Sequence, residues 1–103
     1  MAGATGGEGA AGAAGAAMIV VQVRYLSAMR DQAGRREEAV ELPEGSRLAE
    51  LAEWLALQRG VRLPDPAVMA TLNGRGWTQL PEGMERTLAP GDQVALFPVV
   101  GGG

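Results

Sequence analysis

The sequence predicts a single α+β domain in which a mixed sheet of about five strands wraps one main helix. Three observations predict this fold. Two early segments alternate apolar and polar residues, one central segment carries apolar residues at helical spacing, and two further strand-like segments follow it. A chain of 103 residues has room for one hydrophobic core, so we expect one folded domain.

Residues 1–17 are an extension that we expect to be disordered. They hold eight alanines, six glycines and one charged residue, so they lack the large apolar side chains whose burial offsets the entropy of ordering. They also lack the basic start and the apolar run of a secretory signal, and no stretch of the chain approaches the roughly 20 apolar residues of a membrane span. We therefore expect a folded domain at residues 18–103 in a cytoplasmic protein that has no contact with membranes.

The folded domain opens with two predicted strands that a short helical segment joins. Residues 18–25 alternate apolar and polar side chains, which is typical of a strand with one solvated face. Residues 26–33 carry apolar side chains at helical spacing and are followed by Gly34, which can end a helix. Residues 36–42 alternate again and predict a second strand. We place four acidic residues on its solvated edge, namely Glu37, Glu38, Glu41 and Glu44.

The clearest helix signal covers Arg47 to about Arg59. Ser46 is the expected cap and Gly60 the expected end, while the reciprocal capping box is not expected, because Ala49 stands where its glutamate would be needed. Four apolar residues form one stripe along this helix and predict its buried face, namely Leu48, Leu51, Ala52 and Leu55.

Three further segments complete the predicted sheet. Residues 68–72 read as a strand that ends at Asn73-Gly74, the strongest short turn signal in the chain. Residues 77–80 are predicted to continue beyond that turn as a short strand. A turn at residues 88–92 leads into a last strand at 93–97, and we expect Pro98 to prevent this ladder from continuing as a central strand.

The composition excludes most side-chain chemistry. The chain has no cysteine, no histidine and no lysine, and all nine basic residues are arginine, so thiol and histidine catalysis, disulfides and zinc sites are excluded. The formal charge of −3 argues against nucleic acid as a partner. No metal site is expected. The segment 73–76 lacks the lysine of a phosphate-binding loop, and we expect Trp54 and Trp77 to pack rather than to stack on a ligand.

The C-terminus holds the remaining candidate for a reactive group. Pro98 to Gly103 follow the last predicted strand directly and end in three glycines and an α-carboxylate. Residues without side chains can thread a narrow channel, where another protein's catalytic groups could reach the carbonyl of Gly103. The carboxylate could then attack the α-phosphate of ATP and release pyrophosphate, and a sulfur nucleophile could replace AMP. The alternative is a flexible tail without a role, because glycine loses the most backbone entropy when it is ordered.

These residues resemble the MoaD/ThiS-type β-grasp sulfur carriers, and among them the small subunits of molybdopterin synthase. The resemblance covers Met18 to Gly103, although Val99 and Gly101 stand where the family has proline and alanine. It rests on four motifs, namely Leu96-Phe-Pro-Val-Val-Gly-Gly-Gly103, Leu88-x-x-Gly-Asp-x-Val94, Leu72-Asn-Gly-Arg75 and the opening Val-Arg-Tyr-Leu26.

The resemblance implies a ubiquitin-like β-grasp fold and a role as the sulfur carrier of molybdenum cofactor biosynthesis. Gly103 would be adenylated with ATP by a ubiquitin-activating-type adenylyltransferase (MoeB-like) and would receive sulfur from a sulfurtransferase as a thiocarboxylate. The thiocarboxylate would enter the large subunit of molybdopterin synthase (MoaE-like) and give its sulfur to the pterin precursor. The chain itself would hold no permanent cofactor and would be a non-catalytic donor subunit. The expected partner-binding residues are Phe97, Pro98, Val99, Val100, Gly101 and Gly102.

Three alternatives stay open at this point. Related carriers serve thiazole, tRNA thiolation, tungsten cofactor or cysteine synthesis. The chain could instead be a ubiquitin-like modifier joined to target lysines through Gly103, or a binding module whose tail is inert. For Phe97, a place in the core and a place on an exposed docking face are equally favoured.

Overall fold

The computed structural model describes residues 17–99, so the predicted extension lies outside the described residues except for Ala17. The elements follow the chain in the order β1 (Met18–Tyr25), α1 (Ala28–Ala33), β2 (Glu37–Pro43), α2 (Leu48–Arg59), β3 (Val68–Leu72), β4 (Arg75–Gly76), the 3-10 helices η1 (Trp77–Gln79) and η2 (Gly83–Glu85), and β5 (Gln93–Pro98).

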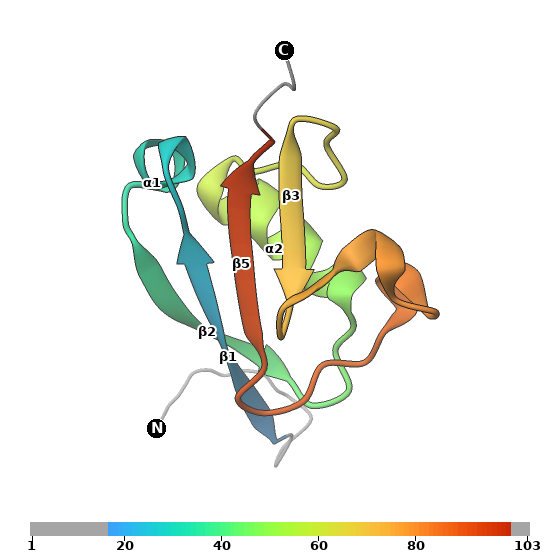
Figure 1. The fold of residues 1–103 in the computed structure, drawn as a ribbon. Helices are drawn as coiled ribbons and strands as arrows, with labels where there is room; N and C mark the ends of the chain where they lie inside the picture. Colours follow the sequence, from blue (N-terminus) through green and yellow to red (C-terminus); the bar gives the residue numbers. More distant parts are fainter. Residues whose placement is uncertain (1–16, 100–103) are drawn as a thin grey trace, which may run out of the picture.

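The strands form one mixed sheet in the order β2-β1-β5-β3-β4. β1 pairs antiparallel with β2, and β3 pairs antiparallel with both β4 and β5, whereas β1 and β5 run parallel at the centre of the sheet. Figure 1 shows α2 crossing behind the sheet, with β3 and β5 in front of it. The predicted α+β architecture, a mixed sheet wrapped on one main helix, is confirmed.

The core lies between the inner face of the sheet and α2. In β1 the alternation predicted from the sequence is realised, because every second residue from Ile19 to Tyr25 is buried. The predicted stripe of α2 is buried as well, with Leu48, Leu51 and Leu55 fully inaccessible to solvent. Burial of one such leucine stabilises the fold by about 2 kcal/mol, so this stripe holds the helix on the sheet more strongly than helix propensity does.

The start of α2 differs from the prediction. Arg47, not Ser46, is the N-cap residue, and the carboxylate of Glu50 accepts a hydrogen bond from the backbone N–H of Arg47. The glutamate half of a capping box is therefore present. Ser46 is buried and its hydroxyl donates to the carbonyl of Pro43 at 2.6 Å, so it serves the preceding turn instead of the helix.

Residues 77–80 do not form the predicted strand. β4 ends at Gly76, and residues 77–79 form the 3-10 helix η1. Trp77 and Leu80 are both buried, three residues apart. A strand would point these two side chains to opposite faces, whereas a helical turn directs both into the core. The Asn73-Gly74 turn itself is confirmed, since both residues have positive φ angles and Leu72 pairs with Arg75.

Glu38 is not on the solvated edge where the sequence analysis placed it. Its side chain is only 9% exposed and accepts hydrogen bonds from three side chains: Tyr25 Oη at 2.5 Å, Arg59 Nε and Nη2 at 2.8 and 2.6 Å, and Arg35 Nη1 at 3.1 Å. The Arg59 guanidinium also lies 4.9 Å from the ring centre of Trp54. This ion-pair cluster joins β1, β2 and the end of α2.

The cluster sets the protonation of its members. Burial alone would raise the pKa of Glu38, but the hydrogen bonds from Arg59 and Tyr25 and the charges of Arg59 and Arg35 outweigh burial and lower this pKa. Burial and the bond to Glu38 raise the pKa of the Tyr25 phenol above its usual range. Glu38 is therefore ionised and Tyr25 neutral at pH 7.

Replacing Glu38 tests the contribution of this cluster to stability. Since the folded state lowers the pKa of Glu38, the stabilisation is complete above the unfolded value of about 4.3 and is lost as the pH falls through the lower folded value. Glu38→Gln should reduce the free energy of unfolding by about 2 kcal/mol at pH 7, because the largely buried Arg59 is left without its charge partner. Urea unfolding should show the difference shrinking below about pH 4. Glu41→Gln, on the exposed face of the same strand, is the control and should change neither value.

Gly60 provides a second test, of the end of α2. It has a φ of +69° and its N–H donates to the carbonyl of Leu55, and an added Cβ would meet no atom within 4 Å. Gly60→Ala should therefore cost about 1 kcal/mol through backbone strain alone. Gly76→Ala is the matched control, because Gly76 has a φ of −59° and the added carbon would lie 3.6 Å from Gln79. An equal loss for both variants in urea unfolding would contradict the strain argument.

Candidate functional site

The position of β5 is set by two turns that bind each other. Gln93 N–H donates to the side-chain oxygen of Asn73 at 2.9 Å, and the Asn73 amide donates to Asp92 at 3.0 Å. The second carboxylate oxygen of Asp92 accepts the N–H of Ala89 at 2.8 Å. The turn before β5 is thus attached to the turn after β3. These bonds fix the register of β5 and with it the point at which the chain leaves the sheet.

β5 continues farther as a central strand than the sequence analysis expected. Pro98 pairs with Val68, and Val99 N–H donates to the carbonyl of Ala67 at 2.9 Å. The missing N–H of Pro98 costs the sheet no hydrogen bond. Backbone groups two residues apart point to the same side of a strand, so the nitrogen of Pro98 points to the same side as the carbonyl of Leu96. The Leu96 carbonyl accepts the N–H of Leu26 just beyond the end of β1, so the nitrogen of Pro98 points to where β1 has already ended.

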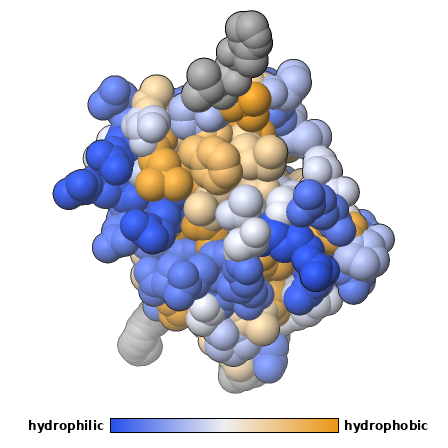
Figure 2. Space-filling model, viewed as in Figure 1, coloured by the Kyte–Doolittle hydropathy of each residue, from blue (hydrophilic) through white to orange (hydrophobic). Residues whose placement is uncertain are grey.

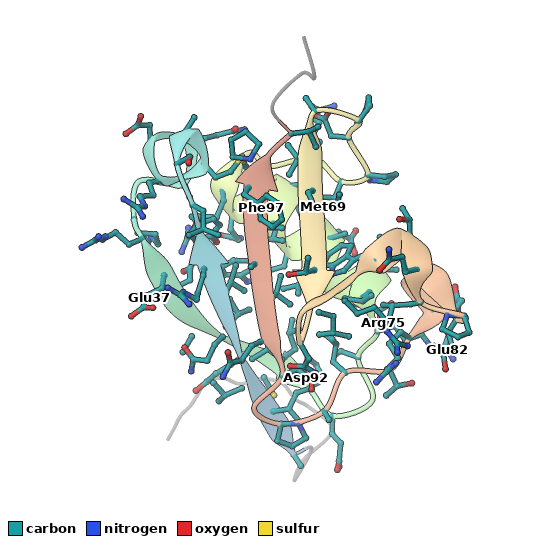
Figure 3. The ribbon with its side chains drawn as sticks, viewed as in Figure 1. Glu37, Met69, Arg75, Glu82, Asp92 and Phe97 are labelled. Atoms are coloured by element: carbon teal, nitrogen blue, oxygen red, sulfur yellow. The ribbon has the colours of Figure 1, made fainter. Side chains whose placement is uncertain are left out.

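An apolar surface surrounds the end of β5 on the face of the sheet opposite α2. Phe97 and Met69 are paired residues on neighbouring strands and lie side by side in Figure 3. Phe97 is partly exposed and Met69 is 39% exposed. Val99, which follows on the same face of β5, is 45% exposed. Leu26 follows β1 and borders the same area. We call these four residues the strand-end patch, and Figure 2 shows apolar atoms gathered over this part of β5 and β3.

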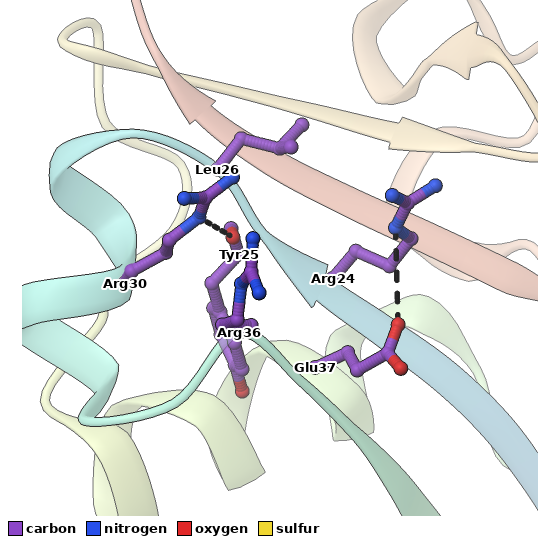
Figure 4. A pocket seen from close by; sticks show the side chains of 6 residues that line it. All are labelled: Arg24, Tyr25, Leu26, Arg30, Arg36 and Glu37. Carbon is purple, nitrogen blue, oxygen red and sulfur yellow. Dashed lines mark hydrogen bonds and ion pairs between the residues drawn. The ribbon is translucent and has the colours of Figure 1, made fainter.

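A surface depression adjoins the strand-end patch on the side of α1. It has a volume of about 490 Å³ and is lined by Arg24, Tyr25, Leu26, Arg30, Arg36 and Glu37. Figure 4 shows Arg30 directed at the backbone of Tyr25, to whose carbonyl its Nε donates at 3.3 Å. Leu26 belongs to both features, so the depression and the patch form one continuous surface. Three guanidinium groups and one carboxylate give the depression a positive charge.

The structure places three of the residues predicted to bind partners at this surface. Phe97 lies on the outer face and outside the buried core, which favours the docking alternative over the core alternative. Pro98 and Val99 lie where β5 ends. Val100, Gly101, Gly102 and the candidate reactive residue Gly103 lie outside the described residues.

The sequence analysis did not identify Leu26, Met69 or the arginine cluster as parts of this surface. A signal for Met69 was present, because the residues of β3 alternate and Met69 stands between positions that face the core. No comparable signal existed for the arginines, since Arg24 is on β1, Arg30 is on α1 and Arg36 is in the loop before β2, and only the fold brings them together.

Other candidate chemistry is not supported in the described part of the chain. Residues 17–99 contain no group of three or more acidic side chains arranged to hold a metal ion. Residues 73–76 form the β3–β4 turn, Trp77 is in the core, and Trp54 packs against the core beside Arg59. Among the helices of residues 17–99, none has the length and apolar character that crossing a membrane requires.

The fold and the surface define a small ubiquitin-like protein whose central last strand leads into a glycine-rich end. Comparison with known families agrees, since the sequence profile of the ThiS family matches residues 23–103. The chain belongs to the ThiS family, and its fold is the β-grasp of MoaD/ThiS-type proteins. No curated protein sequence matches the chain.

Solved structures show the same fold. The chain is similar to the "Putative molybdopterin converting factor, subunit 1" of Pyrococcus furiosus, with 31% identity, 80% of this chain and 99% of that chain covered, and a TM-score of 0.66. It is similar to the HVO 2177 protein of Haloferax volcanii, with 22% identity, 84% and 88% covered, and a TM-score of 0.69. It is also similar to small archaeal modifier protein 1 of Methanosarcina acetivorans, with 22% identity, 84% and 99% covered, and a TM-score of 0.66.

Proposed function

We propose that this chain is the sulfur carrier of molybdopterin synthase and that Gly103 carries the sulfur. The observation that carries the proposal is the match to the ThiS family, which includes the terminal glycines. The 31% identity to the putative molybdopterin converting factor subunit 1 of Pyrococcus furiosus supports it. The geometry of β5 supports it. A central strand held on both sides delivers Pro98 to a fixed point beside an apolar patch, from which the next five residues could extend into a partner.

The proposed chemistry takes place on the main chain. An oxygen of the Gly103 carboxylate attacks the α-phosphorus of ATP, pyrophosphate leaves, and an acyl-adenylate forms. A hydrosulfide-level nucleophile then attacks the acyl carbon, AMP leaves with the electrons of the broken C–O bond, and the product is a thiocarboxylate. ATP is bound and used by the adenylyltransferase, the sulfur comes from a sulfurtransferase, and the large synthase subunit provides the pocket for the pterin precursor.

The composition of the chain suits an activated C-terminus. An acyl-adenylate is an electrophile that amines and thiols capture. This chain has no lysine and no cysteine, so its own side chains offer neither group. The activated end is thereby left for the sulfur nucleophile of the partner.

A ubiquitin-like modifier is the second candidate function, because a modifier would be activated in the same way. The fold is similar to that of small archaeal modifier protein 1. The lack of lysine is again relevant, since a modifier without lysine cannot build chains through isopeptide bonds to its own side chains. This composition is compatible with the addition of single units to a target lysine.

Mass measurement tests the carrier function directly. The purified full chain is incubated with the adenylyltransferase of the same genome, ATP and sulfide, and is then weighed intact. We expect a gain of about 16 Da, the difference between sulfur and oxygen. A variant that lacks Gly102 and Gly103 is the control and should gain nothing. An unchanged mass of the full chain would contradict the proposal.

The pathway is tested in a second step. The thiocarboxylate form is mixed with the large subunit of molybdopterin synthase and its pterin precursor, and sulfur transfer should return the carrier to its original mass. Transfer only to thiazole, tRNA or another acceptor would assign the chain to a different pathway. Cell lysates searched for branched peptides ending in Gly-Gly should show no conjugates; their presence would support the modifier function.

Substitution of Phe97 tests the docking role of the strand-end patch. Phe97→Ser should lower kcat/KM for adenylation about 100-fold, because a part-exposed aromatic at the root of the tail is the type of residue that dominates interfaces. Val20→Ser is the matched control, since Val20 is 37% exposed on the outer face of the same sheet, near the start of β1 and away from the end of β5. Thermal unfolding of both variants checks that each is folded. Equal kinetic losses would show that this patch does not dock the partner.

A further inference from the structure

The depression beside the strand-end patch concentrates positive charge in a chain whose net charge is −3. Arg24, Arg30 and Arg36 line it with a single carboxylate, that of Glu37. Within residues 17–99, one ion pair joins these side chains, between Arg24 Nε and Glu37 Oε1 at 4.0 Å, and the two side chains are 61% and 69% exposed. An exposed pair at that distance contributes little, so Glu37 does not neutralise the group.

Of the six other arginines, four are held in ion pairs, whereas Arg62 and Arg75, which do not line the depression, have none within residues 17–99. Arg35 and Arg59 are held by Glu38, Arg47 by Glu85 and Arg86 by Glu82, at distances of 2.6 to 3.7 Å. By contrast, Arg36 has no ion pair or side-chain hydrogen bond within residues 17–99, and Arg30 donates only to a backbone carbonyl there. The depression therefore gathers guanidinium groups whose donors are available to another molecule.

The position of the depression links it to the proposed docking event. Leu26 lines the depression and also borders Phe97 through the bond from its N–H to Leu96. A protein that covers the strand-end patch and receives the tail will also face these arginines. Leaving their donors desolvated and unpaired would oppose binding, so the complementary surface needs acceptors at this place.

We propose that Arg24, Arg30 and Arg36 bind carboxylate side chains on the surface of the adenylating partner, which makes this depression the electrostatic half of the docking site. The inference rests on the carrier function proposed above. Guanidinium groups match carboxylates through paired N–H donors, and Arg30 is already oriented by its bond to Tyr25. The acidic balance of the whole chain disfavours a polyanion such as nucleic acid, whereas acidic side chains on a docked protein meet the local positive charge.

Two double variants that have the same net charge test the proposal. Arg24→Gln/Arg36→Gln removes two charges from the depression. Arg62→Gln/Arg75→Gln removes two charges from exposed arginines elsewhere that have no ion pair within the described chain, and is the control. Both double variants change the net charge by the same amount, so the long-range attraction to the partner changes equally in both. They differ only in where on the surface the charges are removed. The measurement is steady-state pyrophosphate release by the adenylyltransferase of the same genome, with the full chain as substrate.

We expect the depression double variant to raise the KM for the carrier about tenfold and to leave kcat within about twofold, because a docking contact acts on binding rather than on chemistry. The control should stay within about twofold in both constants. Raising the ionic strength from about 0.05 to about 0.5 M should reduce the difference in KM between wild type and the depression double variant, because salt screens the ion pairs.

Equal KM values for the two doubles, or a loss confined to kcat, would overturn the proposal while leaving the carrier function intact. Failure of the wild-type chain to stimulate pyrophosphate release, seen before any variant is compared, would overturn both. Urea unfolding of the two doubles should match that of wild type, since the substituted side chains are exposed.

Discussion

The parallel pairing of β1 with β5 is the constraint on which the rest of the structure depends. It joins the first and last strands of the described chain at the centre of the sheet, from Gln22 beside Gln93 to Tyr25 beside Leu96. Because parallel neighbours need a crossover, the intervening chain must pass over one face, and α2 lies there with its leucines in the core. The same pairing places residues 94–96 of β5 between β1 and β3. The tail therefore follows a strand with neighbours on both sides and not an edge strand.

This arrangement divides β5 into two faces with separate tasks. Val94 and Leu96 point inward and are almost completely buried, so they fix the strand to the core. Phe97 and Val99 point outward and remain accessible to a partner. Since the inward residues supply the burial energy, the outward residues are free to be chosen for recognition.

Local patterns predicted the elements well and the long-range contacts poorly, for a physical reason. Alternation and helical spacing identify which side of an element is buried, as in β1 and in the stripe of α2. They do not say which distant group a side chain will meet. Alternation in β2 puts Glu38 on the same face as Val40 and Leu42, but its charge partner Arg59 lies 21 positions away at the end of α2, so the buried ion pair could not be predicted from the local pattern. Residues 77–80 were misassigned because two apolar residues three apart fit a helical turn, a competing period that the short segment could not resolve. The reactive end could be proposed from sequence because its chemistry needs only the main chain.

The arginines illustrate the same limit. The sequence does not distinguish the nine arginines from one another, yet the fold places some of them in ion pairs and leaves others unpaired. Arg59 is 17% exposed, saturated by Glu38 and stacked beside Trp54, so it serves stability. Arg36 lies in the open depression with its donors unused within the described chain. The difference arises from how many carboxylates the fold brings within reach of each guanidinium. Water solvates an exposed guanidinium that the fold leaves unpaired, and a partner that covers it must supply acceptors in place of that water.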